Sequence, residues 1–175
     1  MVGSPGGPRS DSLMFKMNIL DRFSLDGRIA LVTGGAGPRF GSSITEALAE
    51  AGATVISASR SLERNKVFVQ QLQNRGFDAH AMRLDIGDPV SIEELHHEII
   101  GAFGRLDVMV NSAHMGVGGG FEEQTYQDWI KSATGDMAGL FAICKAFVPE
   151  MVRSRSDGAT FCRSLYRTCS HSAND

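Results

Sequence analysis

Residues 29–42 read IALVTGGAGPRFGS, an apolar run followed by a glycine-rich turn and the start of a helical pattern. The run 29–32 predicts a buried strand, and residues 42–51 predict a helix that stops at Gly52. A diphosphate needs bare backbone to approach and free N–H groups at a helix N-terminus to receive its charge. This strand, turn and helix therefore predict a dinucleotide site between Thr33 and Gly41, although many glycine turns are simply loops.

The pattern repeats outward from this turn. Strands are predicted over 54–58, 79–84, 106–110 and 159–162, and helices over 62–75, 88–103, 126–134 and 136–153. Regular alternation of strand and helix indicates a parallel sheet covered on both faces. The predicted fold class is α/β, a doubly wound parallel sheet of about five strands in a single domain.

Composition excludes several classes of protein. The chain has 175 residues, a net charge of −3 and 42% hydrophobic residues, which favours one globular domain. We expect no nucleic-acid partner and no membrane span, because there is no basic excess and no long apolar run. Three cysteines without metal-ligand spacing favour a reducing, cytoplasmic location.

Several stretches together resemble the short-chain dehydrogenase/reductase family. They are FSLDGR (23–28), LVTGG (31–35), LDI (84–86), LDVMVNSA (106–113) and residues 129–141, in the family's order and spacing. The resemblance implies a Rossmann-type fold and NAD(P)-dependent hydride transfer between nicotinamide and a small carbonyl or alcohol. It divides the chain into a flexible tail (1–16), an incomplete NAD(P)-binding domain (17–161) and an irregular tail (162–175).

The resemblance also implies cofactor contacts. Asp85 would meet the adenine and Asn111 the adjacent ribose, whereas without the resemblance Asp85 merely ends a strand and Asn111 turns the chain. The residues predicted to contact the cofactor are Thr33, Gly34, Gly35, Arg39, Phe40, Gly41, Ser59, Arg60, Asp85, Ile86, Asn111, Ser112 and Ala113.

The turn departs from the family's Thr-Gly-x-x-x-Gly-x-Gly. It is one residue longer, and Pro38 or Arg39 stands where the middle glycine belongs. Either that side chain leans away from the diphosphate or the loop follows another path. The departure weakens the motif without removing it.

The end of the second predicted strand favours NADP over NAD. NAD-binding proteins place a carboxylate there, whereas this sequence has Ser59 and Arg60, and arginine suits a 2′-phosphate. Arg39 could reach the same pocket. The alternatives are NAD as the cofactor and Arg60 as a solvated residue at a helix start.

The family's catalytic pair, Tyr-x-x-x-Lys, is not found. Ile130 lies four residues after Tyr126, and Ser170 four residues after Tyr166. Asp136 stands at the family's asparagine position, but we expect it to be a helix N-cap. His114 replaces a glycine of the family pattern and is expected to be a loop residue rather than a proton carrier.

The last residues lack the buried strand and catalytic serine that the resemblance implies. Residues 162–175 are polar and unpatterned, as a reading-frame shift or an alternative splice near residue 161, followed by an early stop, would produce. The sequence therefore predicts an oxidoreductase by family, and a chain that is inactive because the Tyr-x-x-x-Lys half is absent. The alternatives are a non-catalytic dinucleotide-binding or interaction protein, and a non-functional product.

The predicted helix 136–153 is apolar on more than one face. Such a helix packs on a sheet and also against a second subunit. We expect self-association or a homo-oligomer, and marginal stability.

Overall fold

The computed structural model describes residues 18–38, 40–116 and 122–154, and within them four parallel strands form one sheet. The strands are β1 (Ile29–Thr33), β2 (Thr54–Ser59), β3 (Ala79–Arg83) and β4 (Val108–Asn111). Their order is β3-β2-β1-β4, so the chain reverses its direction of travel across the sheet at β1. All three pairings are parallel, as the alternation of strand and helix predicts.

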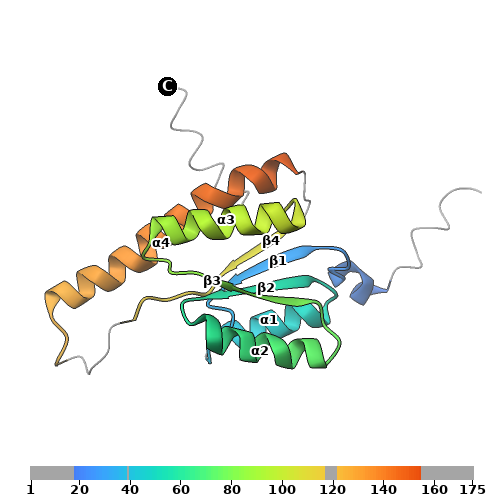
Figure 1. The fold of residues 1–175 in the computed structure, drawn as a ribbon, viewed down its shortest axis with the longest axis horizontal. Coiled ribbons are helices and arrows are strands. Elements are labelled where there is room, and N and C mark those ends of the chain that lie inside the picture. The colour runs from blue at the N-terminus through green and yellow to red at the C-terminus, as the bar shows by residue number, and fades with distance from the viewer. Residues whose placement is uncertain (1–17, 39, 117–121, 155–175) are drawn as a thin grey trace, which may run out of the picture.

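Helices cover both faces of the sheet (Figure 1). One face carries α1 (Gly41–Glu50) and α2 (Leu62–Asn74), and the other carries α3 (Pro89–Phe103) and α4 (Tyr126–Arg153). A short 3-10 helix, η2 (Ile19–Phe23), precedes β1. The doubly wound α/β fold predicted from the sequence is confirmed, with four strands in the described part of the chain.

Two hydrophobic clusters hold these layers together. The cluster on the α3–α4 face includes Leu31, Ile56, Leu95 and Phe147, all at most 1% exposed. The cluster on the α1–α2 face is built from smaller side chains around Val55 and Leu72. Because the larger side chains gather under α3 and α4, the position of α4 depends most on this burial.

The boundaries of α3 follow their sequence signals. Asp88 caps the helix, its side chain accepting from the Val90 N–H at 3.0 Å, and Pro89 is the first helical residue. Gly104 ends the helix with φ at 74°, a left-handed conformation that glycine adopts without strain.

The prediction of two helices over 126–134 and 136–153 is wrong. A single helix, α4, runs through Gly135, and Asp136 lies inside it rather than at its N-cap. The cap is Thr125, which forms a reciprocal capping box with Asp128. Gly135 allows α4 to pack closely against Met115, because a Cβ at this position would overlap the Met115 side chain.

The fourth strand begins later than predicted. Leu106 and Asp107 are buried but precede β4. Asp107 accepts from the Ile29 N–H at 2.8 Å and pairs with Arg28 and Arg105. The carboxylate thus fastens the start of β1 to the segment that leads into β4.

Some predictions concern residues outside the described ranges. These are the two tails (1–16 and 162–175), the strand predicted over 159–162, and Arg39. Within the described ranges, no helix combines the length and apolar character needed to cross a membrane.

Candidate functional site

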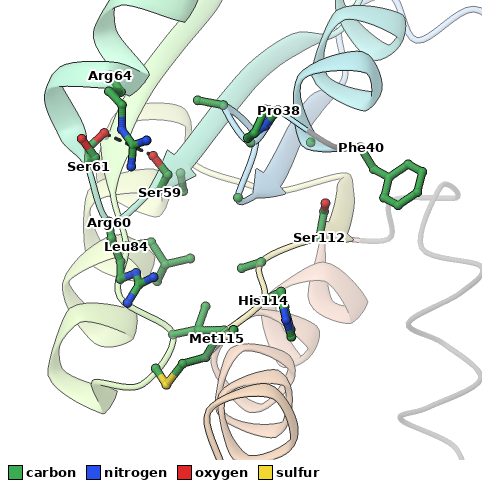
Figure 2. A pocket seen from close by; sticks show the side chains of 18 residues that line it. Pro38, Phe40, Ser59, Arg60, Ser61, Arg64, Leu84, Ser112, His114 and Met115 are labelled. Carbon is green, nitrogen blue, oxygen red and sulfur yellow. Dashed lines mark hydrogen bonds between the residues drawn. The ribbon is translucent and has the colours of Figure 1, made fainter. Parts of the chain in front are cut away.

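A cavity of about 700 Å³ lies at the carboxyl ends of β1, β2 and β4 (Figure 2). This is the point where the strand order reverses, which in open parallel sheets is the usual place for a ligand. The cavity is lined by Gly34, Ala36, Gly37, Pro38, Phe40, Gly41, Ala58, Ser59, Arg60, Ser61, Arg64, Leu84, Ile86, Ser112, Ala113, His114, Met115 and Gly116.

Most of the predicted cofactor residues lie on the cavity wall. Those that line it are Gly34, Phe40, Gly41, Ser59, Arg60, Ile86, Ser112 and Ala113. Thr33, Gly35, Asp85 and Asn111 do not line it, and Arg39 lies outside the described residues.

The glycines of the turn after β1 are packed closely against neighbouring residues. Gly34 has φ at 68°, and a Cβ there would lie 2.9 Å from Ala113 Cα. Gly35 faces inward instead, where a Cβ would lie 2.5 Å from Ser57 Oγ. A Cβ on Gly41 would collide with the Gly34 carbonyl. The two ends of the turn therefore touch, and only glycine allows this.

The longer turn folds back on itself before α1 begins. The Gly37 N–H donates to Gly34 O at 2.8 Å, and the Ser42 N–H donates to Gly37 O at 3.1 Å. The N-cap residue Phe40 makes no side-chain hydrogen bond to the helix. The first turn of α1 is thus left without a side-chain cap, as a ligand-binding helix N-terminus requires.

The end of β2 brings two arginines to the cavity. Arg60 follows the strand directly, and Arg64 comes from the first turn of α2 (Figure 2). Within the described ranges, neither arginine takes part in an ion pair. The sequence prediction missed Arg64, although its place at the start of the helix predicted over 62–75, shortly after Arg60, is the signal that could have found it.

Thr33 connects β1 to the opposite wall. Its side chain is buried, and its Oγ1 accepts from the N–H groups of Ser112 and Ala113, each at 3.1 Å. The predicted cofactor residue Thr33 therefore positions the wall without lining it.

Asp85 and Asn111 lie beside the cavity. The Asp85 Oδ1 accepts from the Gly87 N–H at 3.0 Å, within its own connection. Asn111 ends β4, in register with Thr33. Their predicted contacts with the adenine and the ribose stay predictions.

A histidine and a carboxylate meet on the β4–α4 side. The Nδ1 of His114 lies 2.7 Å from Oδ2 of Asp136, and the other oxygen of Asp136 accepts from the Met115 N–H at 2.6 Å. His114 is a lining residue that we expected to be an ordinary loop residue. The sequence could not show that α4 brings Asp136 to it, because the contact spans 22 residues.

Comparison with known proteins gives a consistent result. Residues 28–161 match the short chain dehydrogenase family. The chain is 36% identical over 124 residues to an uncharacterized oxidoreductase of Mycobacterium tuberculosis, covering 71% of this chain and 44% of that protein. It is 35% identical over 130 residues to a 2,5-dichloro-2,5-cyclohexadiene-1,4-diol dehydrogenase of Sphingobium indicum, covering 74% and 52%.

A solved structure shows the same arrangement of strands and helices. It is the NADP active-site complex of Pseudomonas aeruginosa RhlG, similar with a TM-score of 0.69 and 32% identity, over 77% of this chain and 52% of that chain. The chain thus spans about half the length of the proteins it matches.

Proposed function

The chain belongs to the short-chain dehydrogenase family, and on that premise we propose that its cavity binds NADP. The proposed reaction is hydride transfer between the nicotinamide and a small carbonyl or alcohol. The observation that carries the proposal is the shared cavity. A glycine turn, a helix N-terminus without a side-chain cap and two arginines that form no ion pair with any described residue all line it.

The turn suits a diphosphate because three glycines without side chains, Gly34, Gly37 and Gly41, form this part of the cavity wall. Gly34 and Gly41 approach each other so closely that no side chain separates them, and both line the cavity. The N-terminus of α1 supplies N–H groups and the positive end of the helix dipole.

The charge of the cavity favours NADP over NAD. The described lining contains Arg60 and Arg64 and no aspartate or glutamate. A carboxylate would repel a 2′-phosphate, whereas two guanidinium groups can bind it with charge-assisted hydrogen bonds. Support also comes from the similar structure of Pseudomonas aeruginosa RhlG, which is an NADP complex.

Binding can be tested by titrating NADPH and NADH into the purified chain and measuring both dissociation constants. NADPH is expected to bind at least about 10-fold more tightly, a difference of about 1.4 kcal/mol. The double variant Arg60→Ala/Arg64→Ala should lose that preference with little change for NADH. Arg22→Ala, an exposed arginine on η2, is the control. Equal affinities in the unchanged chain would refute the preference, and no binding of either would refute the proposed function.

Catalysis by the family's usual pair is not expected in this chain. The nicotinamide supplies the hydride, but the proton must come from the protein. Tyr126 begins α4, and the residue four positions later is Ile130 rather than lysine. We therefore propose a slow NADP-dependent oxidoreductase.

Two alternatives are separated by the same titration and an assay of carbonyl reduction. Binding without turnover would favour a non-catalytic dinucleotide-binding or interaction protein. Neither binding nor turnover would favour a non-functional product, for which the coding DNA beyond codon 160 should encode a hydrophobic strand and Tyr-x-x-x-Lys in another frame. The cytoplasmic location stays a proposal that cell fractionation can test.

We also propose that a second copy of the chain covers α4. Trp129, Met137 and Phe141 on this helix are 55%, 72% and 63% exposed. Apolar side chains in such number on one helix are typical of subunit contacts. Light scattering should show a dimer or larger species, and Trp129→Glu/Phe141→Glu should shift it to a monomer. A monomeric unchanged chain would refute this.

A further inference from the structure

We infer that His114, held by Asp136, is the proton-transfer group of this cavity. The inference rests on the proposed function, because the proton accompanies the hydride transfer described above. It starts from one contact: His114 Nδ1 lies 2.7 Å from Asp136 Oδ2, on a side chain that lines the cavity and is 58% exposed.

The backbone around His114 is fixed on both sides. Ser112 and Ala113 donate their N–H groups to Thr33 Oγ1 before it. After it, the Met115 N–H donates to Asp136, and the Met115 carbonyl accepts from Ser132 Oγ at 2.7 Å. Both Ser132 and Asp136 belong to α4, so the imidazole is positioned between β1 and α4. Such support is what a group that must meet a substrate at a set distance needs.

Close packing of α4 brings Asp136 to the histidine. Gly135, the preceding residue, is buried, and a Cβ on it would lie 2.5 Å from the Met115 sulfur. Gly139, one turn later, lies against Ile86 in the same way. With larger residues here α4 would stand farther from the loop, and the carboxylate would not reach Nδ1.

The contact determines which ring nitrogen is free. A carboxylate at Nδ1 favours the proton on that nitrogen, so that Nε2 of the neutral ring is the acceptor. Gly116 leaves room at Nε2, because a Cβ on it would lie 3.1 Å from that atom. When Nε2 takes a proton, the adjacent carboxylate stabilises the imidazolium.

Asp136 is the charged group in direct contact with the ring. Charged side chains on the surrounding elements include Arg60 and Arg64 on the β2–α2 wall, Asp85 on the β3–α3 connection and Lys131 on α4. The two arginines would be engaged by the cofactor phosphate, and the Asp136 carboxylate contacts the ring itself.

The chemical step balances without a further reactant. In the oxidising direction, Nε2 takes the hydroxyl proton of the alcohol as its C–H bond breaks, and the hydride goes to oxidised nicotinamide. The O–H electron pair becomes the second bond of the carbonyl. In the reducing direction, the imidazolium returns the proton to the carbonyl oxygen.

The first test uses the apo protein. Nitrogen-15 NMR of the imidazoles, assigned with His114→Gln, should show the neutral ring protonated on Nδ1. The preference for that tautomer should be lost in Asp136→Asn. His97→Gln, an exposed histidine on α3, should leave the tautomer of His114 unchanged. A ring protonated on Nε2, or a tautomer preference unchanged by Asp136→Asn, would overturn the inference.

The second test measures NADPH-dependent reduction of a small vicinal diketone across pH. His114→Gln should lower kcat about 100-fold, a usual contribution of a general acid, with an unchanged NADPH dissociation constant. Asp136→Asn should also lower kcat, because the imidazole loses the carboxylate that positions it. If NADPH binds but turnover is absent, or persists in His114→Gln, the inference is overturned and the binding proposal stands. If NADPH does not bind, both fail.

Discussion

The β1–α1 wall of the cavity is held largely by contacts between near neighbours in the sequence, with one long-range hydrogen bond from the Gly34 N–H to Ala58 O at 2.7 Å. The β4–α4 wall is held by contacts between distant segments. On the first wall, Gly34, Gly37 and Ser42 bond within a few residues of one another. On the second, His114 reaches 22 residues to Asp136, and Ser112 reaches 79 residues to Thr33. The conformation of the β1–α1 wall therefore depends mainly on the residues of its own turn. The β4–α4 wall keeps its conformation only while α4 stays packed on the rest of the fold.

The largest expected effect breaks the docking of α4. Phe147 is fully buried in the α3–α4 cluster, and Phe147→Ala should lower the free energy of unfolding by about 3–5 kcal/mol because it leaves a cavity. The β4–α4 wall should loosen with it. Lys145→Ala, at an exposed position of the same helix outside the proposed subunit contact, is the control and should change stability by at most about 0.5 kcal/mol. Urea unfolding measures the free energy of unfolding of both variants. Equal losses would contradict the conclusion that Phe147 holds α4 in place.

A smaller effect is expected at the local wall. Gly41→Ala places a Cβ against the Gly34 carbonyl, so the turn must shift, at a cost of about 1–3 kcal/mol. NADPH affinity should fall with it. Gly101→Ala, in α3 with open space around it, should be neutral or stabilise by up to about 1 kcal/mol. Unfolding curves and NADPH titrations of both variants check this, and a Gly41→Ala chain that binds NADPH normally would show that the turn tolerates a side chain.

Thr33→Val tests the two hydrogen bonds that connect the β1–α1 wall to the β4–α4 wall. Valine keeps the shape but removes the oxygen that accepts from Ser112 and Ala113, leaving two N–H groups without a partner. A loss of about 1–2 kcal/mol is expected. Thr134→Val, on the exposed face of α4, is the control. Amide hydrogen exchange should become faster at residues 112 and 113. Unchanged protection of these two amides would contradict the role given to Thr33.

The smallest effect concerns pH at the α3–α4 contact. Burial lowers the pKa of His96, whose ring packs on Phe147. The unfolded chain therefore takes up this proton at higher pH than the folded chain, near the ordinary value of about 6.5. This contribution to stability is complete above that pH and is lost as the pH falls toward the folded pKa.

Thermal melts between about pH 7.5 and about pH 5.5 should show this loss of stability as a fall in melting temperature. His96→Leu should reduce the acid loss, and His97→Leu should reduce it less, since His97 is exposed. An acid slope identical in His96→Leu and the unchanged chain would assign it to other groups.

Sequence patterns predicted the fold well because each element carries its own signals. The apolar run before the turn, the Asp88-Pro89 cap and the stop at Gly104 all act within a few residues. The same locality explains why Gly34, Gly41, Ser59 and Arg60 lie on the wall where they were expected.

The failures occurred where a residue's role comes from a distant partner. Gly135 looked like a helix break, but it allows α4 to lie against Met115. Asp136 consequently faces His114 instead of capping a helix. Asp107, likewise, looked like part of a strand, and its contact with the Ile29 N–H spans 78 residues. Periodicity and propensity contain no information about such pairs.

The length of α4 has a mechanical consequence. Its 28 residues extend about 42 Å, and its fully buried apolar side chains, from Ile143 to Met151, lie near one end. A tilt of about one degree at that end would move the opposite end of the helix by about 0.7 Å over this length. Asp136 lies between the two ends of α4. A contact that displaces the exposed N-terminal end of the helix would therefore change the distance between the Asp136 carboxylate and the His114 imidazole.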